Sequence, residues 1–198
     1  TYPSSGNSLE EGDTGTDFPH NVRQTSDGGY ILVGYTNSFN SNGKTFLLKT
    51  NSSGTAQWTK IYSDIYGKMV YEINSGNYII TGSSSSGAFL MKANSIGDTV
   101  WAKSYSPPIS STWSWSVKPT MDGGFAFCGD IGVSGDTSSI YLVKTDSNGN
   151  GVCYGSVPNY NVSTVNFNTS SPSYLSSSLN TNIAFALQTI DYPINVSN

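Results

Sequence analysis

Residues 25–34 read Thr25-Ser26-Asp27-Gly28-Gly29-Tyr30-Ile31-Leu32-Val33-Gly34, a turn followed by a short apolar strand. The pattern returns as Thr120-Met121-Asp122-Gly123-Gly124-Phe125-Ala126-Phe127-Cys128-Gly129 and, more loosely, as Asn74-Ser75-Gly76-Asn77-Tyr78-Ile79-Ile80-Thr81-Gly82. Asp-Gly-Gly between apolar runs indicates a hairpin, because glycine supplies the positive φ that tight turns need. One β-unit is therefore expected to occur three times in this chain.

Each copy continues in the same way after its closing glycine. A loop rich in Ser, Asn and Gly leads to an apolar third strand ending in lysine, and a second turn leads to a fourth strand with Trp58, Trp101 or Cys153. The closing glycines of successive copies lie 48 and 47 residues apart. Four short strands in a unit of about 40–50 residues are typical of a β-propeller blade. The sequence thus predicts an all-β fold of about three four-stranded antiparallel blades of the propeller type, arranged in an incomplete ring.

The copies cover about residues 18–62, 67–105 and 114–155, so blades are expected within residues 1–155. Residues 156–198 are rich in Ser, Thr and Asn and lack the turn and tryptophan signatures. They are interpreted as an irregular or β-rich C-terminal tail, with a divergent blade or the start of a further domain as alternatives.

Three blades leave the ring open, since propellers have four to eight. Thr1-Tyr2 aligns with Ile61-Tyr62 and Ser104-Tyr105, the ends of two fourth strands, and this predicts an earlier blade. Either the chain is part of a longer polypeptide, or copies of it self-associate, two of them supplying six blades.

Composition excludes several classes of partner. The 198 residues are 36% apolar and only 11% charged, with a net charge of −4. Nucleic acids and anionic membranes require a basic face, so neither is expected. No run of 18 apolar residues is present, so no transmembrane segment is expected.

The polar, weakly charged sequence is typical of a secreted or cell-surface protein. Candidate glycosylation sites in N-x-S/T sequons fit that location: Asn51, Asn161, Asn168 and Asn195. Two cysteines, Cys128 and Cys153, are too few for a disulfide scaffold. A disulfide between them would have to cross an intervening strand. The two cysteines would then be separated by twice the strand spacing of ~4.8 Å, which is beyond the ordinary reach of a disulfide. Two separate cysteines are therefore favoured, with a disulfide as the alternative.

Two segments carry a resemblance to known proteins. Residues 49–58 (KTNSSGTAQW) and 92–101 (KANSIGDTVW) resemble tandem-repeat β-propellers found in secreted and surface proteins of bacteria and archaea. They are also distantly similar to the tryptophan-docking repeat of quinoprotein dehydrogenases, one residue short between Asn and Gly. The resemblance covers about residues 20–155 and brings no catalytic residue. It implies an extracellular domain for interaction or display.

Aromatic residues next to the expected inner strands are the candidate ligand-binding site. Trp113 and Trp115 precede the inner strand of the third copy, near the place that Phe18 and His20 take in the first. Loops entering inner strands line one face of a propeller, where aromatic rings can stack on sugars or on a partner surface. Packing against a neighbouring blade is the alternative for both tryptophans.

Catalysis and metal binding have weaker signals. His20 is the single histidine, and no nucleophile-elbow pattern surrounds any serine. Residues 146–151 (DSNGNG) match the first half of a calcium loop, but Val157 stands where its bidentate glutamate belongs, so a turn is favoured. An acidic cluster in a Gly/Thr loop is interpreted as solvated surface, with calcium capture or glycoside hydrolysis as alternatives: Glu10, Glu11, Asp13 and Asp17. No catalytic residue, metal or cofactor is expected.

The sequence therefore predicts a non-catalytic structural, adhesive or ligand-binding module with a protein or carbohydrate partner on the cell surface. Two alternatives remain open. The chain is either the propeller portion of a secreted glycan-processing enzyme, or a subunit of a self-assembling surface layer or filament.

Overall fold

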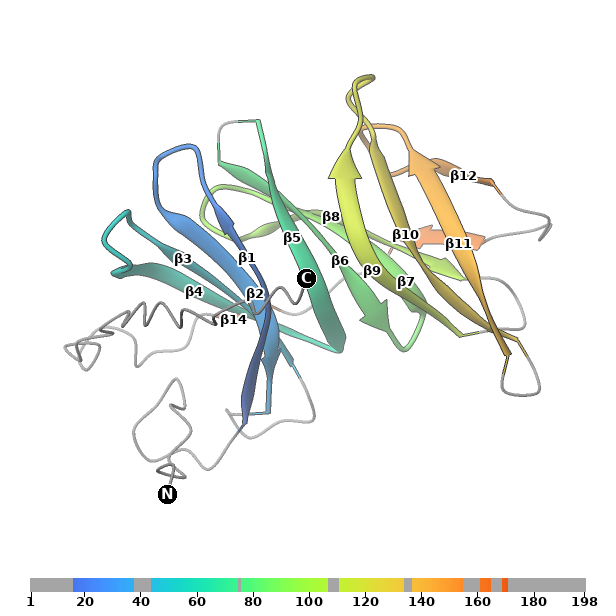
Figure 1. Ribbon diagram of the computed structural model, residues 1–198, viewed down its shortest axis with the longest axis horizontal. Coiled ribbons are helices and arrows are strands. Elements are labelled where there is room, and N and C mark those ends of the chain that lie inside the picture. Colours follow the sequence, from blue (N-terminus) through green and yellow to red (C-terminus); the bar gives the residue numbers. More distant parts are fainter. Residues whose placement is uncertain are drawn as a thin grey trace, which may run out of the picture.

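The computed structural model describes residues 16–37, 44–74, 76–106, 111–133, 137–154, 161–164 and 169–170. Within these ranges the chain is all-β, with three antiparallel sheets that do not close into a ring (Figure 1). Each sheet is built on four strands that follow one another in the sequence, which confirms the expected all-β repeat. The described part of the chain has no helix long and apolar enough to cross a membrane.

The twelve strands of the three repeats are connected as successive hairpins. The first sheet contains β1 (Asp17–Gln24), β2 (Tyr30–Thr36), β3 (Lys44–Thr50) and β4 (Ala56–Ser63). The second contains β5 (Ile65–Ile73), β6 (Asn77–Ser84), β7 (Gly87–Ala93) and β8 (Thr99–Ser106). The third contains β9 (Thr112–Pro119), β10 (Phe125–Val133), β11 (Thr137–Thr145) and β12 (Gly151–Tyr154).

Two short strands come from the segment interpreted as the tail. Strand β13 (Asn161–Thr164) pairs with β8, and β14 (Thr169–Ser170) pairs with β4. They extend the outer edges of the second and first sheets, so these parts of the segment join existing sheets.

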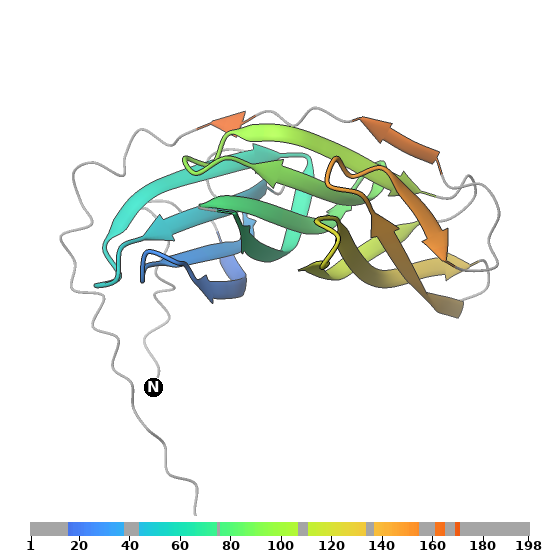
Figure 2. The same ribbon diagram turned by 90° about the horizontal axis from the view of Figure 1, so that it is seen from above.

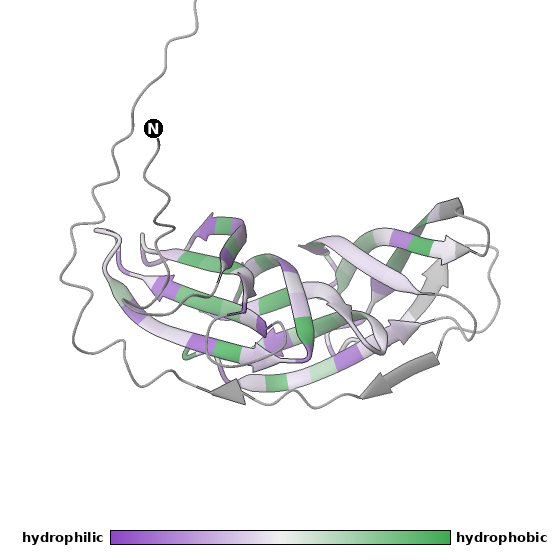
Figure 3. Cartoon of the chain, turned by 90° about the horizontal axis from the view of Figure 1, so that it is seen from below, coloured by the Kyte–Doolittle hydropathy of each residue, from purple (hydrophilic) through white to green (hydrophobic). Residues whose placement is uncertain are grey.

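The sheets stand side by side along an arc, with their first strands β1, β5 and β9 on its concave side (Figure 2). Strand β5 contacts β1, β2 and β3, and β9 contacts β5, β6 and β7. Hydrophobic and hydrophilic bands alternate along the strands, because successive side chains point to opposite faces (Figure 3). One apolar core lies between the first and second sheets, and another between the second and third.

A tryptophan and a tyrosine of each fourth strand dock on the next sheet. The Trp58 ring lies 5.9 Å from the Tyr78 ring, centroid to centroid, and packs against Gly97 in the turn between β7 and β8. A Cβ at Gly97 would lie 2.9 Å from a Trp58 ring carbon. The Tyr62 hydroxyl donates a hydrogen bond to the Gly97 carbonyl oxygen. This position therefore requires glycine, both for its φ of +84° and for the approach of the ring.

The same contacts join the second and third sheets. The Trp101 and Phe125 ring centroids are 6.1 Å apart, and a Cβ at Gly149 would lie 2.9 Å from two Trp101 ring carbons. The Tyr105 hydroxyl donates to the Gly149 carbonyl oxygen over 2.6 Å. We call this arrangement the joint. Its repetition explains why Trp-x-Lys-x-Tyr occurs in both fourth strands, at 58–62 and 101–105.

The lysine between the two aromatic residues completes each joint. Lys60 forms a 2.9 Å ion pair with Asp98, and Lys103 donates a hydrogen bond to the Asn150 side chain. Asp98 and Asn150 directly follow the docking glycines. The Lys60 ammonium group holds the pKa of the Asp98 carboxyl below its usual value.

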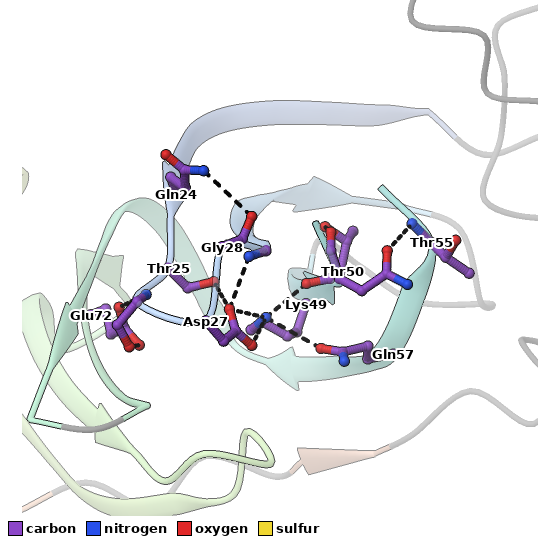
Figure 4. A network of polar contacts seen from close by, with 12 residues as sticks. Gln24, Thr25, Asp27, Gly28, Lys49, Thr50, Thr55, Gln57 and Glu72 are labelled. Atoms are coloured by element: carbon purple, nitrogen blue, oxygen red, sulfur yellow. Dashed lines mark hydrogen bonds and ion pairs between the residues drawn. The ribbon is translucent and has the colours of Figure 1, made fainter. Parts of the chain in front are cut away.

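The turn between β1 and β2 binds a buried lysine of β3 (Figure 4). The Asp27 carboxylate accepts hydrogen bonds from the Thr25 hydroxyl, the Gly29 amide and the Lys49 ammonium group, the last over 2.8 Å. Lys49 also donates to the carbonyl oxygen of Thr50. Together these donors hold the pKa of Asp27 well below its usual range, the bond from Lys49 contributing most. The same contacts recur in the third sheet among Thr120, Asp122, Gly124 and Lys144.

Candidate functional site

Every sheet has a β-bulge in its first strand, opposite the glycine that closes the repeated motif. In the third sheet Gly129 pairs with Ser114, and Cys128 pairs with Ser116, so Trp115 is the extra residue. A Cβ at Gly129 would lie 1.7 Å from the Trp113 carbonyl oxygen, so only glycine lets the two strands approach this closely. Corresponding Cβ atoms would lie 2.3 Å from the Phe18 oxygen at Gly34 and 1.9 Å from the Tyr66 oxygen at Gly82.

The bulged residues of the first and second sheets are His20 and Lys68. A bulge interrupts the ladder and redirects the side chain of its extra residue, and bulges are common beside functional sites. The repeated glycine thus redirects one side chain per sheet, in the strand that lies on the concave side of the arc. In the three sheets these side chains are His20, Lys68 and Trp115.

These three side chains form one series of contacts across the three sheets. The His20 Nδ1 atom lies 2.8 Å from the Gly67 carbonyl oxygen. Because a carbonyl oxygen only accepts, Nδ1 carries the proton, and Nε2 of the neutral ring can accept a hydrogen bond from the Lys68 ammonium group 3.4 Å away. The same ammonium nitrogen lies 5.4 Å from the centroid of the Trp115 ring. The Trp115 indole donates to the Asp130 carboxylate, which ends the series.

Two opposing electrostatic effects act on the Lys68 ammonium group. Burial lowers the pKa of Lys68, because removal from water disfavours its charged form. The face of the Trp115 ring supplies negative electrostatic potential to the ammonium group, a contact worth about 0.5–1 kcal/mol at exposed sites. Trp115 is itself 50% exposed and Lys68 is half-buried, so part of the aromatic surface beside the lysine is open to a ligand.

A second row of aromatic side chains lies two residues before the bulges. Phe18, Tyr66 and Trp113 are all exposed large side chains. The Tyr66 ring stacks on Tyr35 with centroids 5.5 Å apart and an interplanar angle of 10°. Phe18 lies 6.2 Å from the same Tyr35 ring. We call the two rows together the inner-edge face: Phe18, His20, Tyr66, Lys68, Trp113 and Trp115.

The three residues predicted to bind ligand all lie on this face. His20 and Trp115 are brought together through Lys68, and Trp113 stands beside Trp115 on β9. A further cationic cluster lies on the same strands, where Arg23 and Lys118 are 5.7 and 4.9 Å from the centroid of the Tyr71 ring.

Sequence reasoning missed Lys68 and Tyr66. The signal was available, because Lys68 stands 14 residues before Gly82, as His20 stands before Gly34 and Trp115 before Gly129. Tyr66, Phe18 and Trp113 share a spacing of 16 residues in the same way. Counting back from the closing glycine would have identified both rows.

The calcium-like segment at residue 146 folds as a turn. The Asp146 carboxylate accepts the backbone N–H groups of Asn148 and Asn150, each over 2.8 Å. Asn51 and Asn94 make the corresponding bonds in the other two sheets. The carboxylate oxygens of Asp146 therefore serve the turn, and the hydrogen bonds that they accept, first from the Asn150 side-chain amide and then from the backbone, hold the pKa of Asp146 below its usual value. No group of three His, Cys, Asp or Glu residues suited to a metal ion occurs in the part of the chain that the structure describes.

The remaining candidate residues are distributed over several parts of the molecule. Cys128 is a free, half-buried cysteine on β10, and β11 lies between it and β12, the strand of Cys153. Asn51 uses its side-chain oxygen in the turn, and Asn161 begins β13. The other sequons and most of the acidic cluster lie outside the described residues, namely Asn168, Asn195, Glu10, Glu11 and Asp13, as do Thr1 and Tyr2.

Chemically, the inner-edge face offers aromatic surfaces, one ammonium group and one imidazole, and the Asp130 carboxylate beside it is already bound to the Trp115 indole. This set suits stacking and hydrogen bonding to a ligand. Comparison with models of protein families, with curated proteins and with solved structures finds no significant match to this chain.

Proposed function

We propose that this chain is a non-catalytic binding module of the propeller type, secreted or displayed on a cell surface, whose inner-edge face binds a carbohydrate. The contact series from His20 through Lys68 and Trp115 to Asp130 carries this proposal. It assembles groups from all three sheets at one place, outside the two apolar cores.

The propeller assignment is supported by the order and packing of the sheets. Each sheet has four strands in sequence order, the first strands follow the concave side of the arc, and each sheet packs on the next through a repeated joint (Figure 2). Blades that radiate from a common centre have this arrangement. In that interpretation the inner-edge face lines the central channel, where propellers present ligand sites.

Carbohydrate is the ligand class that best matches the chemistry. Sugar rings present apolar C–H faces that stack on aromatic side chains, and their hydroxyl groups accept from ammonium groups and exchange hydrogen bonds with imidazole. Trp113 and Trp115 are 39% and 50% exposed, enough to offer ring faces. Lys68 beside them favours a sugar that carries a carboxylate, since the pair would be charge-assisted. The extracellular location is supported by the low charge and the sequons.

A glycan array on the native chain and two variants tests the proposal. Trp115→Ala and Lys68→Met should each weaken binding of the selected glycan at least tenfold by calorimetry, because each removes a direct contact. Met121→Ala is the matched control, since Met121 is fully exposed in a turn away from this face. If all three variants bind the glycan equally strongly, the inner-edge face is excluded as the site. These variants are Trp115→Ala, Lys68→Met and Met121→Ala.

A further inference from the structure

The first sheet carries the receiving half of a joint. In the two joints described above, the receiving sheet supplies an aromatic residue at the start of its second strand and a glycine of positive φ in its second turn. Tyr30 and Gly54 take these positions in the first sheet, and the φ of Gly54, +82°, matches the +84° of Gly97. No Trp-x-Lys-x-Tyr strand stands against them among the residues that the structure describes.

The same surface of the first sheet is less completely buried than the equivalent surfaces of the other two sheets. Tyr30, Leu32 and Leu48 are only half-buried. Their counterparts on the second and third sheets are all 3% exposed or less, because the preceding sheet covers them: Tyr78, Ile80, Met91, Phe125, Phe127 and Val143. Three apolar positions that are buried in the second and third sheets are therefore partly exposed in the first sheet. We call Tyr30, Leu32, Leu48 and Gly54 the receiving face.

The opposite end of the molecule lacks the complementary half. Cys153, Gly155 and Val157 stand in the third repeat where Trp101, Lys103 and Tyr105 stand in the second. A second copy of this chain, approaching with its third sheet, would thus bring none of the three docking side chains. In both joints the fourth strand of one sheet docks on the next sheet along the chain. The receiving face therefore requires a fourth strand other than β12 of a second copy.

From this geometry we propose that the receiving face binds a β-sheet of the same repeat type whose fourth strand reads Trp-x-Lys-x-Tyr. Its tryptophan packs against Tyr30 and Gly54, and its tyrosine donates to the Gly54 carbonyl oxygen. Its lysine reaches the Thr55 hydroxyl, which stands where Asp98 and Asn150 accept lysine in the two known joints. The two joints inside the chain fix the chemistry of the partner.

A short extension of the full chain tests this proposal. Adding Ala-Gln-Trp-Thr-Lys before Thr1 completes a Trp-x-Lys-x-Tyr pattern with Tyr2, in the alignment with residues 56–62. The tether keeps the strand at an effective concentration in the millimolar range. We expect a rise in melting temperature of about 4 °C, and in 5-fluorotryptophan-labelled protein a fifth ¹⁹F resonance protected from a soluble paramagnetic probe.

Matched variants make each outcome decisive. An extension with alanine in place of its tryptophan should leave the melting temperature unchanged. In a Tyr30→Ser background the tryptophan extension should give less than half of its stabilisation, whatever Tyr30→Ser itself costs. A fifth resonance fully open to the probe, with no rise in melting temperature, overturns the proposal. A native chain that is dimeric by light scattering and becomes monomeric in Tyr30→Ser assigns the face to a second copy and also overturns it.

Discussion

Trp101 and Trp115 are both tryptophans, but they lie in two different environments. The Trp101 ring is pressed against Gly149 and lies 6.1 Å from the Phe125 ring in the joint between two sheets. The Trp115 ring is 50% exposed and faces the Lys68 ammonium group on the inner-edge face. Their positions in the repeat decide this difference, since one belongs to the fourth strand and the other is the bulged residue of the first strand. One tryptophan stabilises the fold, and the other is available for a ligand.

The largest effect should come from the joint. Trp101→Ala is expected to lower the free energy of unfolding by about 3–4 kcal/mol, because it removes a large packed ring and leaves a cavity beside Gly149. Urea denaturation measures this, and at low urea the folded variant should keep its affinity for glycan. A loss below 1 kcal/mol would show that the joint does not hold the second and third sheets together.

The second-largest loss of stability is expected when the glycine opposite the bulge is replaced. Gly129→Ala places a Cβ 1.7 Å from a backbone oxygen, so the bulge must shift, at a cost of about 2–3 kcal/mol in the free energy of unfolding. Ligand binding should weaken as well, since Trp115 moves with the bulge. Gly123→Ala is the control: its φ is +80° but no atom lies near, so the strain alone should cost about 1 kcal/mol. Equal losses for both variants would refute the steric role of Gly129.

A smaller effect on stability is expected in the turn that contains Asp27. The native pKa of Asp27 is held low, so its stabilisation is complete above the unfolded value of about 3.9 and is lost as the pH falls toward the native value. Asp27→Asn should cost about 1 kcal/mol at pH 7, because the carboxylate is half exposed, and it should reduce the fall in melting temperature between pH 5 and pH 2.5. Lys92 offers a comparison within the chain, since Ser75 replaces the aspartate there. An unchanged acid profile in Asp27→Asn would contradict the assignment.

The smallest effect on stability belongs to the ligand-facing tryptophan. Trp115→Ala should lower the free energy of unfolding by about 0.5–1 kcal/mol, the value of its exposed contact with Lys68, since the ring is half exposed and packs in no joint. Thermal denaturation beside Trp101→Ala measures the contrast. Comparable losses for the two variants would mean that Trp115 is a core residue, the alternative that its sequence context allowed.

The repeat made the sheets predictable from sequence. Asp-Gly-Gly turns and closing glycines identified twelve strands in three units, because both signals are local and have a steric cause. The bulges were not predicted. A bulge depends on the pairing of Gly34, Gly82 and Gly129 with a strand some fifteen residues earlier, and this pairing is visible only when the two strands are aligned.

The candidate site was predicted in part for the same reason. Trp113, Trp115 and His20 were conspicuous as aromatic or unique residues, whereas Lys68 resembles any surface lysine in the sequence. Its role comes from contacts with two neighbouring sheets, which depend on the packing of the whole arc. The direction of the joints likewise became clear only from the partners of Trp58 and Trp101.

The central claim is that the bulges bring His20, Lys68 and Trp115 together, and proton NMR tests it directly. His20 is the single histidine, so its imidazole signals are recognised without a full assignment. With Nε2 3.4 Å from the Lys68 nitrogen, the account predicts nuclear Overhauser effects between the imidazole and the Lys68 ε-methylene protons. It also predicts that Trp115→Ala shifts the Lys68 signals. An imidazole without contacts to Lys68, and Lys68 signals that Trp115→Ala leaves unmoved, would contradict it.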